Sequence, residues 1–223
     1  MKQKLMLKRL IIWFTAFFFT AYAAYNIFVL IRDRAALPFE GKFISITIAA
    51  IFVVLAVFML TTDVKNLPFR TARKIVFILT MLLLVFFKLR MSTQVINFLE
   101  TSPTLLTVVY GGAYFMTVAA LMLLILYYVF FRNHILFHFK NSVVPPTVAM
   151  ILFLGSLTLE MILLIFYGIG LEASFLRTIV IRPVFYLGFV GLCVYFLLFP
   201  QIKMQPMRRC SVNSSHSTSS TDK

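Results

Sequence analysis

The sequence contains few acidic residues and few cysteines. Only 7 of its 223 residues are Asp or Glu, and a single one, Glu160, lies inside a long apolar run. The chain therefore lacks the pair of intramembrane acids that an aspartyl protease dyad requires. The 2 cysteines, Cys193 within an apolar run and Cys210 beyond it, have no partners that suit a disulfide, so they indicate no redox chemistry.

Catalytic and cofactor motifs are also missing from the sequence. It contains no Gly-x-Ser-x-Gly nucleophile elbow, no His-Glu-x-x-His zinc motif and no phosphate-binding loop. His134 and His138 could align on one helix face, but no nearby Cys or carboxylate completes a metal site. We therefore predict no catalytic residues, no metal site and no cofactor, and an enzymatic function is unsupported.

Six long apolar runs occupy most of the chain, at about residues 10–31, 43–61, 74–91, 104–131, 147–170 and 178–199. A bilayer core ~30 Å thick requires about 20 helical residues at ~1.5 Å each, and five runs meet this length. The third is shorter, because its uninterrupted part ends just before Lys88 and Arg90. We predict an all-α, six-span transmembrane helical bundle over residues 1–206 and a disordered, Ser/Thr-rich cytoplasmic tail over 207–223.

Basic residues are distributed unevenly among the loops. The chain carries 21 Lys and Arg and has a formal net charge of +14. With the N-terminus inside, the cytoplasmic segments contain fourteen Lys and Arg, and the outer segments contain six. This asymmetry predicts an N-in, C-in arrangement whose inner face meets anionic lipid headgroups. No basic domain stands apart from the spans, so we expect no nucleic-acid partner.

Glu160 is the sharpest candidate for a functional residue. A lone carboxylate about thirteen residues into a span is costly unless it is paired, protonated or wetted. Lys88 reaches an equal depth in the third span, with Arg90 one half-turn further out. Arg182 lies at the matching depth of the hairpin formed by the last two spans. All three cations could instead extend to the headgroups, and Pro183 favours that alternative for Arg182 because proline suits the start of a helix.

Further polar and aromatic residues share the outer half of the predicted spans with Glu160. Of these, we include Asn26 and Tyr114 among the candidate ligand-binding or ion-pair residues. The wider group consists of Tyr22, Tyr25, Asn26, Tyr110, Gly111, Gly112, Tyr114, Tyr167 and Tyr186. These residues could line an outward-facing cavity, but tyrosines also form the aromatic belt at any membrane interface.

Two function classes remain open for this predicted multi-pass protein of the cell membrane. The slightly favoured class is a small ligand-binding or transport bundle with an outer-half polar site around Glu160. The alternative is a non-catalytic structural or regulatory subunit of a membrane complex, with Glu160 held in an ion pair. Small residues such as Gly188 and Gly191 indicate close helix packing, which could serve a homo-oligomer or another membrane subunit.

Overall fold

The computed structural model describes residues 2–32, 39–63, 70–101, 105–132, 143–167 and 180–199. Within these ranges the chain is almost entirely helical and has no strand, which confirms the predicted all-α class. The long helices are α1 Lys2–Arg32, α2 Phe39–Leu60, α3 Arg70–Thr101, α4 Leu105–Leu126, α5 Val144–Tyr167 and α6 Arg182–Leu198. A 3-10 turn, η1 Thr61–Asp63, extends α2, and a π-helical segment, η2 Tyr127–Arg132, extends α4.

Several helices are longer than the predicted spans. α1 begins at Lys2, and α3 is 32 residues long, because basic and polar residues interrupt a hydrophobic run without ending a helix. α5 begins at Val144, so Pro145 and Pro146 occupy its first turn, where a missing N–H leaves no helical hydrogen bond unmade. Parts of the predicted segments lie outside the described residues: residue 104, residues 168–170 and 178–179, and the tail over 207–223.

Within the described residues, four helical segments are long and apolar enough to cross a membrane: Gln3–Arg32, Phe39–Leu60, Gly111–Phe130 and Val144–Ile162. α6 is also apolar, but its 17 residues extend only about 25 Å. α3 is long enough, yet charged residues approach its apolar centre from both ends. These lengths and compositions are consistent with a membrane-embedded protein.

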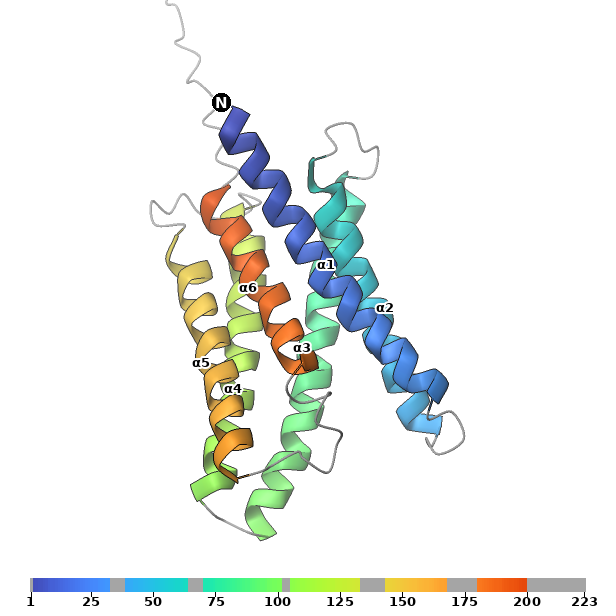
Figure 1. Cartoon of the computed structure of the whole chain (residues 1–223), viewed down its shortest axis with the longest axis vertical. Coiled ribbons are helices and arrows are strands. Elements are labelled where there is room, and N and C mark those ends of the chain that lie inside the picture. The colour runs from blue at the N-terminus through green and yellow to red at the C-terminus, as the bar shows by residue number, and fades with distance from the viewer. Residues whose placement is uncertain are drawn as a thin grey trace, which may run out of the picture.

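The helices form a closed ring in which each helix packs against its neighbour in the chain. α6 also packs against α1, which closes the ring. Figure 1 shows that consecutive helices run in opposite directions, so the start of α1 and the end of α6 lie at the same end of the bundle. A Lys8–Phe199 contact, with Nζ 6.0 Å from the ring centroid, joins these two ends.

α6 lies between α1 and α5 and is packed on several sides (Figure 1). Its aromatic rings contact rings from α1, α2, α5 and η2. The Phe189 centroid lies 5.3 Å from that of Phe19 in α1 and 5.2 Å from that of Phe153 in α5. The Phe185 centroid lies 5.7 Å from that of Phe52 in α2. α6 therefore organises the aromatic part of the core, and the helices that surround it must match its side chains.

Two glycines bring α6 close to α1. A Cβ atom added to Gly188 would lie 2.7 Å from the Phe19 ring, which is closer than packed side chains tolerate. A Cβ atom added to Gly191 would collide with the hydroxyl of Thr15. Both glycines are therefore required for the close approach, as small residues are in membrane helix pairs. The buried Thr15 hydroxyl has no hydrogen-bond partner within the described ranges.

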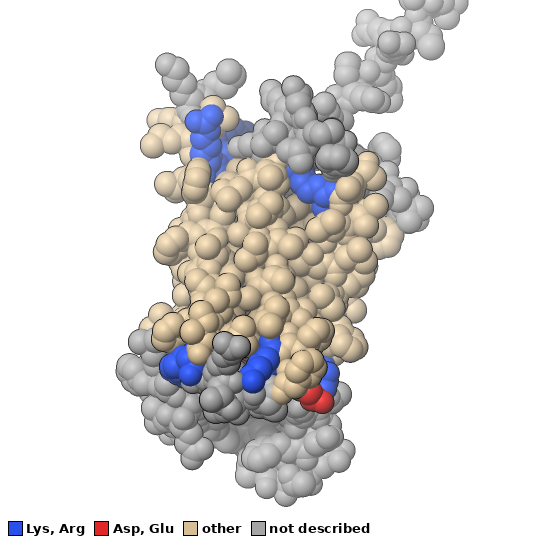
Figure 2. Space-filling model, turned by 90° about the vertical axis from the view of Figure 1, so that its right-hand side faces the viewer, with Lys and Arg blue, Asp and Glu red and all other residues tan. Residues whose placement is uncertain are grey.

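The outside of the bundle is strongly apolar. Large side chains are exposed along the helices, among them Phe14, Phe17, Phe28, Val57, Phe86, Phe115 and Ile151. Figure 2 shows Lys and Arg gathered at the two ends of one face, with a broad band between them in which no charged side chain is visible among the described residues. An apolar surface of this extent is costly in water and matches the hydrocarbon part of a bilayer.

Candidate functional site

Glu160 of α5 is bonded to two side chains of α6. Its Oε2 lies 3.3 Å from Nη1 of Arg182, and its Oε1 accepts a 2.7 Å hydrogen bond from the Tyr186 hydroxyl. Arg182 and Tyr186 are four residues apart, so they project from the same face of α6. One carboxylate therefore links two points on a neighbouring helix, and each of its oxygens has a partner.

A cluster of three hydroxyl groups continues the network behind Glu160. Tyr186 Oη lies 2.9 Å from Ser156 Oγ and 3.1 Å from Thr117 Oγ1, and these last two oxygens are 2.8 Å apart. Ser156 and Thr117 are also within hydrogen-bond distance of the carbonyl oxygen of Ala113, at 2.7 and 3.0 Å. The cluster therefore links α4, α5 and α6 through side chains alone.

The hydroxyl protons in this cluster can all be satisfied at once. Tyr186 donates its only proton to Glu160, so its oxygen is left to accept a hydrogen bond from Ser156 or Thr117. The remaining hydroxyl can donate to the Ala113 carbonyl. This order gives a directed chain of hydrogen bonds that ends on the Glu160 carboxylate, and such chains polarise and strengthen one another.

Lys88 of α3 completes the charged part of the site. Its Nζ lies 4.4 Å from the centroid of the Phe185 ring and 5.4 Å from that of Tyr114, which are cation–π distances. Lys88 also interacts electrostatically with both Glu160 and Arg182. Two cations from different helices therefore lie near one carboxylate, and Arg182 is the one in direct contact.

The burial of these groups makes the pairing energetically important. The side chain of Glu160 is 7% exposed and that of Arg182 is 31% exposed. A carboxylate removed from solvent to this degree is costly unless a cation or hydrogen-bond donors stabilise it. Arg182 is the first residue of α6, where the positive end of the helix dipole adds a smaller favourable contribution for Glu160.

Two of the candidate residues lie away from this site. Arg90 pairs with Glu40 at 3.7 Å, and both side chains are exposed, at 53% and 79%. Asn26 donates a hydrogen bond from Nδ2 to the Tyr22 carbonyl one turn earlier in α1, at 2.8 Å. The structure thus brings Lys88, Tyr114, Glu160 and Arg182 together and leaves Arg90 and Asn26 outside.

Ser156 and Thr117 were not among the residues that the sequence predicted. Ser156 precedes Glu160 by four residues, so its position on the same face of α5 could have been inferred from helical spacing. Tyr186 follows Arg182 by four residues, so it too could have been placed on the same helix face as a candidate residue. Thr117 offers no such clue, because threonines in apolar helices commonly bond their own backbone, as Thr80 and Thr158 do here.

No family model, no curated protein and no solved structure matches the chain. The class that the fold and composition define is a helical protein whose described part contains four helices long and apolar enough to cross a membrane. Its site combines one buried carboxylate, two nearby cations and three hydroxyl groups, and we refer to it below as the Glu160 network. Among the described residues, no group of three or more His, Cys, Asp or Glu could hold a metal ion.

Proposed function

We propose that the protein is a multi-pass membrane protein in which all six helices cross the bilayer and both termini are cytoplasmic. Consecutive helices alternate in direction, and the start of α1 lies at the same end of the bundle as the end of α6 (Figure 1). Both observations support an even number of crossings. The excess of Lys and Arg in the segments at this end supports the orientation. In this arrangement residues 1–206 form one membrane domain, and the Glu160 network lies in its outer half.

Cysteine labelling on intact cells tests the orientation. In a Cys210→Ser background, Gln3→Cys should react with an impermeant thiol reagent only after the membrane is permeabilised. Glu40→Cys, at the opposite end of the bundle, should react without permeabilisation. Cys193 is fully buried and should remain silent in both variants. Strong labelling of Gln3→Cys on intact cells would reverse the assignment.

Within this topology, the Glu160 network serves as the site of a small ligand-binding or transport bundle. The observation that carries this proposal is the position of one carboxylate near two cations from two helices, α3 and α6. Arg182 and Lys88 offer Glu160 alternative partners, so protonation or a bound solute could favour one arrangement of the helices over another. Such a pair of states is the minimum that a transport cycle or a ligand response requires.

The hydroxyl chain supports a role in which Glu160 exchanges a proton. Tyr186 is bonded both to the carboxylate and to the Ser156–Thr117 pair, so it lies between the ionisable group and the interior of the bundle. Intramembrane carboxylates in polar networks commonly mark proton or ion pathways. A solute-coupled proton movement is therefore the activity to measure first.

The test uses proteoliposomes that contain a trapped pH-sensitive dye and an imposed pH gradient. Amino acids, small carboxylates and sugars are added in turn, and the rate of gradient collapse is compared for wild type and Tyr186→Phe. Tyr186→Phe retains the charged groups of Glu160, Arg182 and Lys88 and the shape of the ring, but removes the link to the hydroxyl cluster. We expect at least one solute to accelerate collapse in wild type and to lose most of this effect in Tyr186→Phe. Collapse that no solute alters would contradict the transport function.

The second candidate is a non-catalytic structural or regulatory subunit. The observation that favours it is the satisfaction of both Glu160 oxygens in a side chain that is only 7% exposed. In that role the network would only hold α4, α5 and α6 together, and its loss would reduce stability without affecting any solute response. Co-purification of a second membrane protein in stoichiometric amounts, together with an inert transport assay, would favour this alternative.

A further inference from the structure

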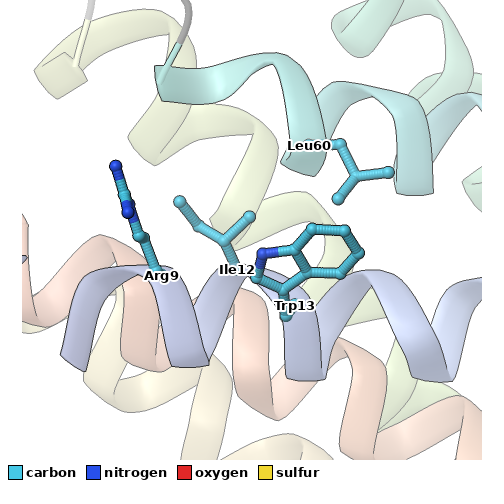
Figure 3. Close-up of a pocket in the computed structure, with 4 residues that line it drawn as sticks. All are labelled: Arg9, Ile12, Trp13 and Leu60. Atoms are coloured by element: carbon cyan, nitrogen blue, oxygen red, sulfur yellow. The ribbon is translucent and has the colours of Figure 1, made fainter. Parts of the chain in front are cut away.

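A hollow of about 230 Å³ lies at the end of the bundle where α1 begins and α2 ends. It shares no residue with the Glu160 network. It is lined by Arg9, Ile12, Trp13 and Leu60. Figure 3 shows Arg9, Ile12 and Trp13 projecting from α1 toward the helix that carries Leu60. The Arg9 guanidinium lies at one side of the hollow, and the Trp13 ring lies at the other, near Leu60.

The positive charge at this hollow is available to a ligand. Arg9 is exposed and makes no ion pair or hydrogen bond with the described part of the chain. Its neighbour Lys8 differs, because its ammonium group lies over the Phe199 ring at the end of α6. A second guanidinium, that of Arg73, is fixed close to the end of α2 by a hydrogen bond to the Thr61 carbonyl. An anion that reached Arg9 would therefore enter a region of positive potential.

The other walls of the hollow are apolar. Trp13 is 67% exposed and Leu60 is 41% exposed, while Ile12 is buried beneath them. Tryptophan is enriched at the level of lipid headgroups, because its ring is amphipathic. An occupant that satisfies this lining must carry a negative charge at one end and a hydrocarbon chain at the other. A phospholipid with an anionic headgroup has both parts, and the surrounding bilayer supplies it.

We propose that this hollow binds one anionic phospholipid, with the headgroup phosphate at Arg9 and an acyl chain along Trp13 and Leu60. Basic pockets between membrane helices at the cytoplasmic face recognise anionic headgroups in this way. Assignment of the lipid to the cytoplasmic leaflet rests on the orientation proposed above. The binding itself depends only on the residues of the hollow, so it can be tested without that orientation.

Trp13 makes the test direct, because it is the single tryptophan of the chain. The full-length protein is reconstituted in phosphatidylcholine vesicles that contain a fixed fraction of brominated phosphatidylglycerol or brominated phosphatidylcholine. Bromine quenches tryptophan fluorescence at short range, so the two quenching levels report the relative occupancy of the hollow. We expect wild type to prefer phosphatidylglycerol by about fivefold, the contribution of roughly one basic residue at an anionic surface.

Arg9→Gln should reduce this preference to less than twofold, and Arg9→Lys should retain part of it. The matched control is Lys4→Gln, which removes one exposed cation from the same helix outside the hollow and should leave the preference unchanged. Arg9 is exposed, so the Gln variant should fold, and its helical circular dichroism checks this directly.

Three results would overturn the proposal. Equal quenching of wild type by the two lipids would reduce the hollow to ordinary contact with bulk lipid. An unchanged preference in Arg9→Gln would place the anion elsewhere. Inorganic phosphate at millimolar concentration should have no effect, and relief of the phosphatidylglycerol quenching by phosphate would identify a free anion as the ligand instead of a lipid.

Discussion

The two faces of α6 are held to their neighbours by different physical means. Toward α5, Arg182 and Tyr186 make directed bonds to the two oxygens of Glu160. Toward α1, Gly188 and Gly191 have no side chain, and the backbone lies close against Phe19 and Thr15. The contact with α5 therefore depends on charge and on individual hydrogen-bonding atoms. The contact with α1 depends on the absence of side chains at Gly188 and Gly191.

This difference determines which kind of substitution should disrupt each contact. A polar contact can be broken with almost no change of shape, because replacement of a carboxylate by an amide removes the negative charge that stabilises the cationic partner. An apolar contact of this kind is insensitive to charge but cannot accept one added methyl group without displacing a helix. Matched control substitutions elsewhere in the chain distinguish loss of charge from added volume as the cause of an effect.

Glu160→Gln should produce the largest effect. It removes the negative charge that contacts Arg182 while Lys88 remains nearby, and we expect a loss of about 2–3 kcal/mol in the free energy of unfolding. This is below the ~3–5 kcal/mol of a fully buried pair, because the Arg182 side chain is 31% exposed. Thermal melting in detergent micelles measures the change.

The control is Glu40→Gln, which breaks the exposed pair with Arg90. Both side chains of that pair are more than half exposed, so we expect a change below about 0.5 kcal/mol. Equal losses in Glu160→Gln and Glu40→Gln would show that burial does not set the strength of the first pair.

Gly191→Ala should destabilise the protein by about 1–3 kcal/mol, because the new methyl group collides with Thr15 and forces α1 away from α6. The matched control is Gly112→Ala in α4, where an added Cβ meets no atom within 4 Å. That control should melt at or slightly above the wild-type temperature, since alanine favours helix over glycine. A tolerated Gly191→Ala would mean that α1 and α6 can separate at little cost.

Tyr186→Phe should have a smaller effect on stability. It removes the hydrogen bond to Glu160 and the oxygen that accepts from Ser156 or Thr117, but keeps the ring among its aromatic neighbours. We expect a loss of about 0.6 kcal/mol for each lost bond, the average for such bonds between membrane helices. Unfolding by titration with a denaturing detergent measures it. A loss as large as that of Glu160→Gln would indicate that the hydroxyl chain, rather than the ion pair, stabilises the α5–α6 contact.

Thr15→Val should change stability least and in the opposite direction. The valine has nearly the same shape, and it replaces a buried hydroxyl that has no partner in the described ranges. We expect a gain between zero and about 1 kcal/mol, because the cost of an unsatisfied hydroxyl disappears. A clear loss of melting temperature would reveal that Thr15 makes a hydrogen bond in the membrane.

Much of the site could be located from the sequence, but its pairing could not. Glu160 stands out because it is a lone acid in an apolar run, and this requires no knowledge of the fold. Lys88 and Arg182 were equally plausible partners by depth. The choice between them depends on which faces of α3 and α6 turn toward α5, and apolar helices of this kind offer little amphipathic contrast from which to predict that rotation.

The hydroxyl cluster shows the same limit more clearly. Thr117, Thr80 and Thr158 have similar sequence surroundings. Each is a threonine in an apolar helix, and each hydroxyl lies within hydrogen-bond distance of the carbonyl oxygen four residues earlier. Of these three, only Thr117 also forms hydrogen bonds with side chains of other helices in the described part of the chain. Its role follows from its position opposite Ser156 and Tyr186, which no local pattern encodes.

By itself the sequence determined the helices, because runs of apolar residues must satisfy their backbone hydrogen bonds internally wherever water is excluded. It also determined that a single carboxylate would need a partner. The packing of the helices against one another is what brings Arg182 and Tyr186 to Glu160 and turns Gly188 and Gly191 toward α1. A helix forms from contacts within a few residues, whereas the partner of each helix face depends on how all the described helices fit together at once.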